Sequence, residues 1–129
     1  MNGNSTGVGT YPTLRLFDRH LWVVISDPRA DAQSVLIVNL TSWNKDKDCA
    51  CILKPGDHPF IHHTTCVSYQ DAKIVKDGFL EQGLRLGLIV SRESASDDLV
   101  EAIIRGAGIS AFLPLGCRYV LVRQKLLDE

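Results

Sequence analysis

Hydrophobic and polar positions divide the chain into short apolar runs that end in turn residues. The two clearest runs, Leu21–Ile25 and Val35–Val38, are uninterrupted and rich in β-branched residues. Runs of this length and composition are typical of strands that are buried on both faces. Small polar residues close both runs, Ser26-Asp27-Pro28 after the first and Asn39-Leu40-Thr41-Ser42 after the second. These runs are therefore predicted to form the central strands of the fold.

Weaker strand patterns flank the central runs. Thr13–Phe17 alternates apolar and polar residues, which predicts an edge strand. Cys49–Leu53 and Ala72–Val75 predict further strands, and Lys54–Asp57, with the sequence KPGD, predicts a turn between strands. Strands thus dominate the first two thirds of the chain.

The last third changes character. Ser94–Asp98 predicts the start of a helix, because a serine N-cap is followed by acidic residues in the first turn. Apolar residues at helical spacing give this helix one buried face, formed by Leu99, Val100, Ile103 and Ile104. Gly106 and Gly108 are expected to end it. Ile109–Val122 predicts a closing strand or an ordered tail, whereas Phe79–Val90 fits neither pattern.

The order of these elements predicts the fold class. Strands come first and a helix late, so we expect an α+β, mainly β fold: an antiparallel barrel or roll with a C-terminal helix. With 129 residues the chain is long enough for one domain with its own core. We assign residues 1–12, rich in Gly, Asn, Ser and Thr, to a flexible N-terminus and residues 13–129 to a single barrel-like domain.

Composition narrows the function classes. Apolar residues make up 45% of the chain and charged residues 22%, as in ordinary globular proteins. The formal net charge of −1 argues against an extended basic surface, so nucleic acid would have to bind at a local patch. The four cysteines are irregularly spaced, and the sequence shows neither a secretory leader pattern nor a membrane-length apolar run. We therefore expect a cytoplasmic protein with reduced thiols and no membrane partner.

Polar residues at the ends of the central strands are the first candidate site. Arg19 and His20 stand where the first strand begins, and Thr41 and Ser42 stand where the second ends. If the strands are antiparallel neighbours, these groups meet at one end of the sheet. Cleavage of RNA requires an acid, a base and donors for the phosphate charge, which this set can supply. The alternative is that these residues simply begin and end strands.

A cluster of histidines and cysteines is the second candidate site. His58, His62 and His63 lie within six residues, and Cys49, Cys51 and Cys66 flank them. Such side chains are zinc ligands, but their spacing differs from the familiar zinc motifs, and cysteines are often inert core residues. Trp43, beside Thr41 and Ser42, either stacks on a base or fills the core.

The order of segments resembles the MazF/PemK (Kid, CcdB-like) family, the growth-inhibiting ribonuclease toxins of bacterial type II toxin–antitoxin pairs. In that family a basic residue introduces an apolar strand, a second strand ends in a Thr-Ser or Thr-Thr pair, and a Ser/Thr-x-Val stretch begins a third. The corresponding segments here are HLWVVISD, VLIVNLTS and TTCVSYQDAKIV. The resemblance covers roughly residues 18 to 76, with the predicted helix at 97 to 105 as the family's C-terminal helix.

Two positions depart from the family pattern. His20-Leu21 replaces the usual Arg-Pro at the start of the first strand, with Arg19 one place early. Asn39-Leu40 replaces the family's proline before the Thr-Ser pair.

The resemblance implies an SH3-like, CcdB-like fold and a metal-independent endoribonuclease that needs no cofactor. It implies that His20 or Arg19 acts as acid or base and phosphate partner, while Thr41 and Ser42 contact the scissile phosphate. It also implies a homodimer, an RNA groove across the dimer and an antitoxin that occupies this groove. Our candidate substrate-binding residues are Trp43, His58, His62, Thr65 and Tyr69.

Two other functions remain open at this point. A non-catalytic SH3-like barrel that binds a protein or peptide would explain the missing Arg-Pro, because catalysis in such a site depends on a placed cation. A zinc-dependent hydrolase would use the histidine and cysteine cluster.

Overall fold

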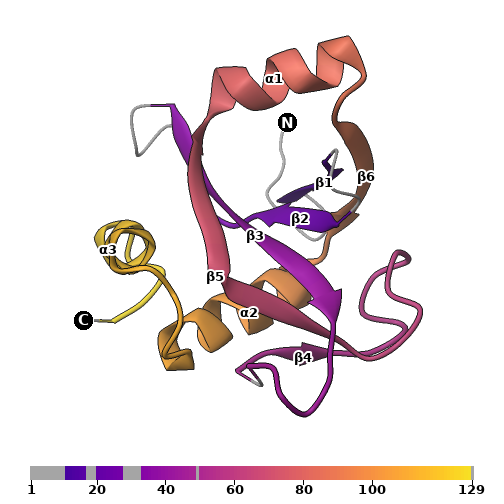
Figure 1. The fold of residues 1–129 in the computed structure, drawn as a ribbon. Helices are drawn as coiled ribbons and strands as arrows, with labels where there is room; N and C mark the ends of the chain where they lie inside the picture. The colour runs from indigo at the N-terminus through magenta and orange to yellow at the C-terminus, as the bar shows by residue number, and fades with distance from the viewer. Residues whose placement is uncertain (1–10, 17–19, 28–32, 49, 129) are drawn as a thin grey trace.

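The computed structural model describes residues 11–16, 20–27, 33–48 and 50–128. These residues form one six-stranded antiparallel sheet, which curls into a half-barrel, and three helices (Figure 1). The strands are β1 (Tyr11–Arg15), β2 (Leu21–Val24), β3 (Ser34–Ser42), β4 (Ile52–Leu53), β5 (Thr65–Lys76) and β6 (Val90–Ala95). The helices are α1 (Asp77–Leu86), α2 (Asp97–Ile109) and α3 (Leu115–Arg123). The predicted class, a mainly β α+β barrel or roll with a helical C-terminal part, is confirmed.

The two central apolar runs form β2 and β3, which are antiparallel neighbours. The order of strands across the whole sheet is β4-β5-β3-β2-β1-β6. Leu21 on β2 lies opposite Leu40 on β3. On its other side β3 pairs with β5 from Ser34 opposite Lys76 to Ser42 opposite Thr65. The start of β2 and the end of β3 therefore lie at the same end of the sheet, as predicted.

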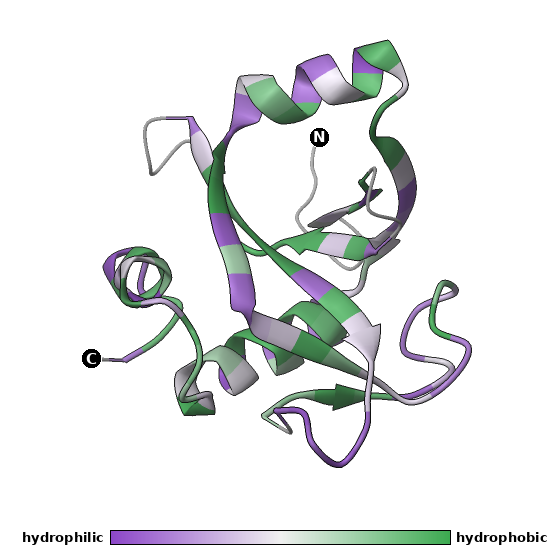
Figure 2. Ribbon diagram, in the orientation of Figure 1, coloured by the Kyte–Doolittle hydropathy of each residue, from purple (hydrophilic) through white to green (hydrophobic). Residues whose placement is uncertain are grey.

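Alternation along the central strands separates two cores. Leu21 and Val23 of β2 pack into a core that α2 completes, whereas Trp22 and Val24 face a smaller core that receives Leu80 of α1. Figure 2 shows the mainly hydrophobic course of β2 and the hydrophilic loop that follows β3. The apolar runs thus bury both faces of the central strands, and polar groups gather where these strands end.

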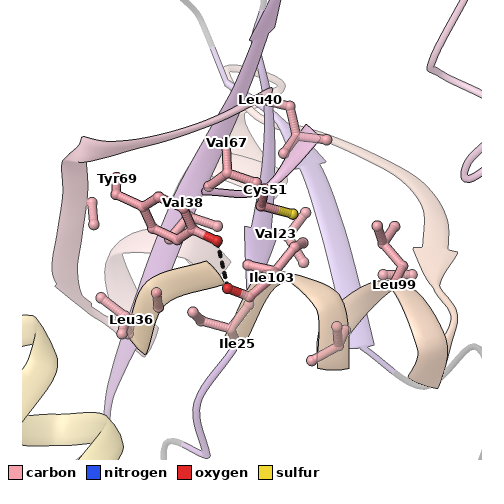
Figure 3. Close-up of a cluster of buried hydrophobic side chains, with 14 of the residues drawn as sticks. Val23, Ile25, Leu36, Val38, Leu40, Cys51, Val67, Tyr69, Leu99 and Ile103 are labelled. Atoms are coloured by element: carbon pink, nitrogen blue, oxygen red, sulfur yellow. Dashed lines mark hydrogen bonds between the residues drawn. The ribbon is translucent and has the colours of Figure 1, made fainter. Parts of the chain in front are cut away.

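Helix α2 begins as its sequence predicts. The Ser96 hydroxyl oxygen accepts a hydrogen bond from the backbone N–H of Leu99 at 3.1 Å, which caps the helix. Leu99 and Ile103 are buried in the larger core (Figure 3). Val100 is buried in the same core, and Ile104 packs against it. The predicted apolar face is confirmed.

The prediction that Gly106 and Gly108 end α2 is wrong, because the helix continues to Ile109. Gly106 instead permits a close approach between α2 and the sheet. A Cβ atom at this position would lie 2.7 Å from Cys51 Cβ and would also collide with the Tyr69 hydroxyl. The glycine is required by packing rather than by helix termination.

Two further expectations are corrected. Ile109–Val122 is not a closing strand or tail, because Leu115–Arg123 forms α3 and buries Cys117, Val120 and Leu121 at helical spacing. The strand predicted at Thr13–Phe17, which corresponds to β1, is not an edge strand, because β1 lies between β2 and β6.

Other element boundaries differ from the sequence prediction. Only Ile52 and Leu53 of the predicted Cys49–Leu53 strand pair with β5, and Cys49 lies outside the described residues. Ala72–Val75 is part of one continuous 12-residue strand, β5. Phe79–Val90 divides between α1 and the start of β6.

The proposed N-terminal segment, residues 1–12, is described only at its end. Tyr11 and Pro12 belong to β1, and residues 1–10 lie outside the described part of the chain. Among the helices that the structure describes, none combines the length and the apolar character needed to cross a membrane.

The buried thiol of Cys51 gives the fold a pH dependence. Burial raises its pKa from the ordinary 9.0 to about 11, so between these values the folded protein retains a proton that the unfolded chain loses. The contribution of Cys51 to stability is therefore fully present below pH 9 and is lost as the pH rises through about 11. Urea unfolding between pH 8 and 11 should show a steeper loss of stability for the wild type than for Cys51→Ala. Equal slopes would contradict this assignment.

Candidate active site at the end of the central strands

His20 stands immediately before β2, next to the end of β3. Its Nδ1 atom lies 3.2 Å from the carbonyl oxygen of Leu40. Because a carbonyl oxygen only accepts hydrogen bonds, Nδ1 carries the proton in this contact, and the neutral ring is the tautomer with an unprotonated Nε2. The backbone of β3 thereby orients the imidazole.

Ser42 and His63 form a contact between two side chains at this end of the sheet. The Ser42 hydroxyl oxygen lies 2.7 Å from Nε2 of His63, and both residues are exposed. The sheet register explains the contact, because Ser42 lies opposite Thr65 and His63 comes two residues before Thr65. A hydroxyl held against an imidazole is an arrangement suited to proton transfer.

Lys47 brings a positive charge to the same place. Its Nζ atom donates to the Ser42 carbonyl oxygen at 2.6 Å and lies 3.5 Å from the Thr41 hydroxyl oxygen. The loop that follows β3 thus folds back over the end of its own strand. A chain with a net charge of −1 therefore still presents a cation beside the Thr41 hydroxyl and the Ser42 backbone.

A small cavity of about 140 Å³ lies here and is called the catalytic cavity after the role proposed below; Lys47 stands beside it and does not line it. It is lined by His20, Leu40, Thr41, Ser42, Phe60, Ile61, His63 and Thr65. The structure thus brings together four of the residues that the sequence nominated, His20, Thr41, Ser42 and Thr65. The cavity is smaller than the roughly 300–1,000 Å³ of sites that hold whole ligands, and its size suits a single phosphate group.

His58 is buried, which overturns its assignment as a substrate contact. The side chain is 3% exposed. Its Nε2 atom donates to the Glu93 carbonyl oxygen of β6 at 2.5 Å, and its Nδ1 atom accepts the backbone N–H of Phe60 at 3.0 Å. His58 therefore fastens the loop between β4 and β5 to β6. This loop supplies Phe60, Ile61 and His63 to the catalytic cavity.

Removal of the His58 side chain should destabilise the protein by roughly 1–3 kcal/mol, because two buried hydrogen bonds of about 0.5–1.5 kcal/mol each are lost. His62→Ala, which changes an exposed neighbour, should alter stability by less than about 0.5 kcal/mol. Urea unfolding of the two variants measures the difference. Equal stability of the two variants would show that His58 does not fasten the loop.

Tyr69 is also buried. It is 1% exposed, and its hydroxyl donates to the Ile103 carbonyl oxygen of α2 at 2.5 Å (Figure 3). Burial raises the pKa of this phenol above its ordinary value. Tyr69 joins the sheet to α2, and its nomination as a substrate contact stays a prediction.

The remaining residues that the sequence nominated for the site are not among the described residues that line the catalytic cavity. Trp43 is half-buried beside Ser42, and its indole N–H is buried without a hydrogen-bond partner among the described residues. His62 is exposed but does not line the catalytic cavity. Arg19 lies outside the described residues. The roles of Trp43, His62 and Arg19 stay predictions.

The suggested zinc ligands do not converge in the described part of the chain. Cys51 and Cys66 are buried free thiols, and His58 uses both ring nitrogens in hydrogen bonds. Among the described residues, which exclude Cys49, no three His, Cys, Asp or Glu side chains form a group that could hold a metal ion.

Sequence reasoning missed two members of the site. His63 belongs to the noted histidine cluster, but only the register between β3 and β5 selects it over His58 and His62. Lys47 lies in the charged loop NKDKD, where the sequence does not distinguish it from Lys45.

Comparison with known proteins assigns neither a family nor a function to the chain. No protein-family model matches the chain, and no curated protein matches it. The candidate site therefore rests on the geometry of its own residues.

Proposed function

We propose that this protein is a metal-independent endoribonuclease that cleaves RNA at the catalytic cavity. The observation that carries the proposal is the 2.7 Å contact between Ser42 and His63 in a cavity that His20 also lines. Two imidazoles around one phosphate-sized space supply the acid and the base for phosphodiester cleavage near neutral pH.

The proposed reaction is an internal transfer within the RNA. One imidazole removes the proton from a ribose 2′-hydroxyl, and this oxygen attacks the adjacent phosphorus. The bond from phosphorus to the 5′ oxygen breaks, and the other imidazole donates a proton to that oxygen. The products are a 2′,3′-cyclic phosphate and a 5′-hydroxyl end, with no redox change and no net consumption of water.

The other polar groups act on the phosphate. The Ser42 and Thr41 hydroxyls can donate to its non-bridging oxygens, and the Lys47 ammonium offsets the negative charge that develops on them. Lys47 thus supplies the placed cation that the family pattern assigns to arginine.

The resemblance to MazF/PemK toxins extends the proposal to biology and partners. In this proposal the protein inhibits growth as the cytoplasmic toxin of a toxin–antitoxin pair, binds a cognate antitoxin and acts as a homodimer. Light scattering of the purified protein tests the dimer, and copurification with the product of a neighbouring short reading frame tests the antitoxin.

Incubation of the purified protein with a panel of RNAs, with and without a chelator, tests the activity. We expect RNA cleavage that survives chelation. Absence of cleavage together with tight binding of a protein or peptide would favour a non-catalytic barrel. Cleavage that stops with chelator and returns with zinc would favour a zinc-dependent hydrolase.

A further inference from the structure

A larger groove adjoins the catalytic cavity and has no role in the proposed chemistry. Its volume is about 650 Å³, which lies within the range of sites that bind whole ligands. It is lined by Thr41, Asp46, Lys47, Asp48, Cys66, Val67, Ser68, Tyr69, Gln70 and Phe112. Thr41 lines both spaces, and Lys47 lines the groove while it donates to Ser42. A ligand in the catalytic cavity therefore has this groove as its neighbour.

Phe112 stands at the groove as an exposed aromatic side chain with a fixed backbone. The residue is 56% exposed, and its backbone N–H donates to the Ser110 hydroxyl oxygen at 3.1 Å. The Ser110 hydroxyl in turn donates to the Asp48 carboxylate at 2.5 Å, and this serine is only 7% exposed. The linker between α2 and α3 is thus tied to the loop that carries Lys47. An aromatic ring left in solvent on an anchored backbone is a suitable platform for base stacking.

The polar lining of the groove favours a base over a phosphate. Asp46 and Asp48 give its lining two carboxylates against the one ammonium of Lys47, a net negative charge that disfavours an anionic group. Asp48 already accepts hydrogen bonds from Ser110 and Ala50. Within the described part of the chain, the carboxylate of the exposed Asp46 has no hydrogen-bond partner. It can therefore accept a bond from an N–H donor on a ligand.

We propose that the groove binds the nucleoside next to the cleaved phosphate. Its base stacks on Phe112, and an exocyclic amino group of that base donates to Asp46. The volumes agree with this division, because the catalytic cavity has room for a phosphate and the groove has room for a base with its ribose. The inference rests on the proposed ribonuclease function and adds the base-binding part of the same site.

An RNA oligonucleotide that the wild type cleaves, and versions with an abasic residue on either side of the cleaved bond, test the stacking. Loss of one base–aromatic stack corresponds to roughly a 5- to 150-fold change. The wild type should therefore cleave one of the two abasic versions with a kcat/KM roughly 5- to 150-fold lower than that for the intact RNA. Phe112→Ala should cleave the intact RNA less efficiently than the wild type does. It should also lose most of the preference for the intact RNA over the abasic version. Leu115→Ala, an exposed control that does not line the groove, should behave like the wild type.

The Asp46 contact has its own test. The wild type should prefer cytosine over uracil at the bound position, because only cytosine carries an exocyclic amino group, and Asp46→Asn should lose most of that preference. If Phe112→Ala retains the full preference for the intact RNA, the groove does not bind the base, although the ribonuclease function stands. If Asp46→Asn retains the wild-type base preference, the amino contact is wrong. If the wild type cleaves no RNA, both the function and the groove assignment fail.

Discussion

Replacement of His63 by alanine should reduce RNA cleavage by roughly 100- to 10,000-fold, the range expected when a general acid or base is removed. His63 is the imidazole in contact with the Ser42 hydroxyl, and it lines the catalytic cavity. Its side chain is exposed, so the substitution should leave the fold intact. Single-turnover cleavage of one RNA oligonucleotide, with circular dichroism as the folding check, gives the measurement. His20→Ala should cause a loss of similar size.

The adjacent histidine is the matched control. His62 is exposed and does not line the catalytic cavity, so His62→Ala, even with the loss of a substrate contact, should reduce the rate far less than His63→Ala. Wild-type cleavage by a folded His63→Ala protein would remove His63 from the mechanism. An equal loss in both histidine variants would indicate a general effect of the loop rather than acid–base chemistry.

Replacement of Gly106 by alanine should destabilise the protein, although alanine is the better helix former. The added methyl group would collide with the Tyr69 hydroxyl and would lie 2.9 Å from the Ala50 carbonyl oxygen. Overpacking of this kind costs about 1–3 kcal/mol and sometimes more, and because the contacts include the Ala50 backbone we expect a cost above the helix-propensity gain of about 1 kcal/mol. Urea unfolding should show a clearly lower free energy of unfolding.

Gly116 provides the control for the same chemical change. It also lies in a helix, α3, but a Cβ atom there would have nothing within 4 Å. Gly116→Ala should therefore leave stability unchanged or raise it by up to about 1 kcal/mol. If the two alanine variants are equally stable, α2 does not approach the sheet as closely as described.

Much of the candidate site was predictable because strand ends follow from short-range patterns. The apolar runs that became β2 and β3 end at polar residues, and antiparallel pairing of neighbours brings those ends together. This reasoning placed His20 beside Thr41 and Ser42 before any register was known. The start of α2 at Asp97 was equally local, because a serine cap and acidic residues mark it.

The other parts of the site depend on long-range packing. Tyr69 and His58 are polar residues that resemble surface ligands in the sequence, yet hydrogen bonds to Ile103 and Glu93 hold them inside the fold. His63 became identifiable only through the register between β3 and β5. The sequence predicts a strand or tail where α3 forms, because the helical spacing of its buried residues Cys117, Val120 and Leu121 is short.

Cleavage of RNA that carries one 2′-deoxynucleotide at the cleaved position tests the central claim most directly. In the proposed reaction the 2′-hydroxyl of that nucleotide is the attacking group. We expect the unmodified RNA to be cut in the presence of chelator to a 2′,3′-cyclic phosphate end, and the modified linkage to remain intact. Cleavage at the 2′-deoxy linkage, or no cleavage of unmodified RNA, would contradict the assignment of the catalytic cavity.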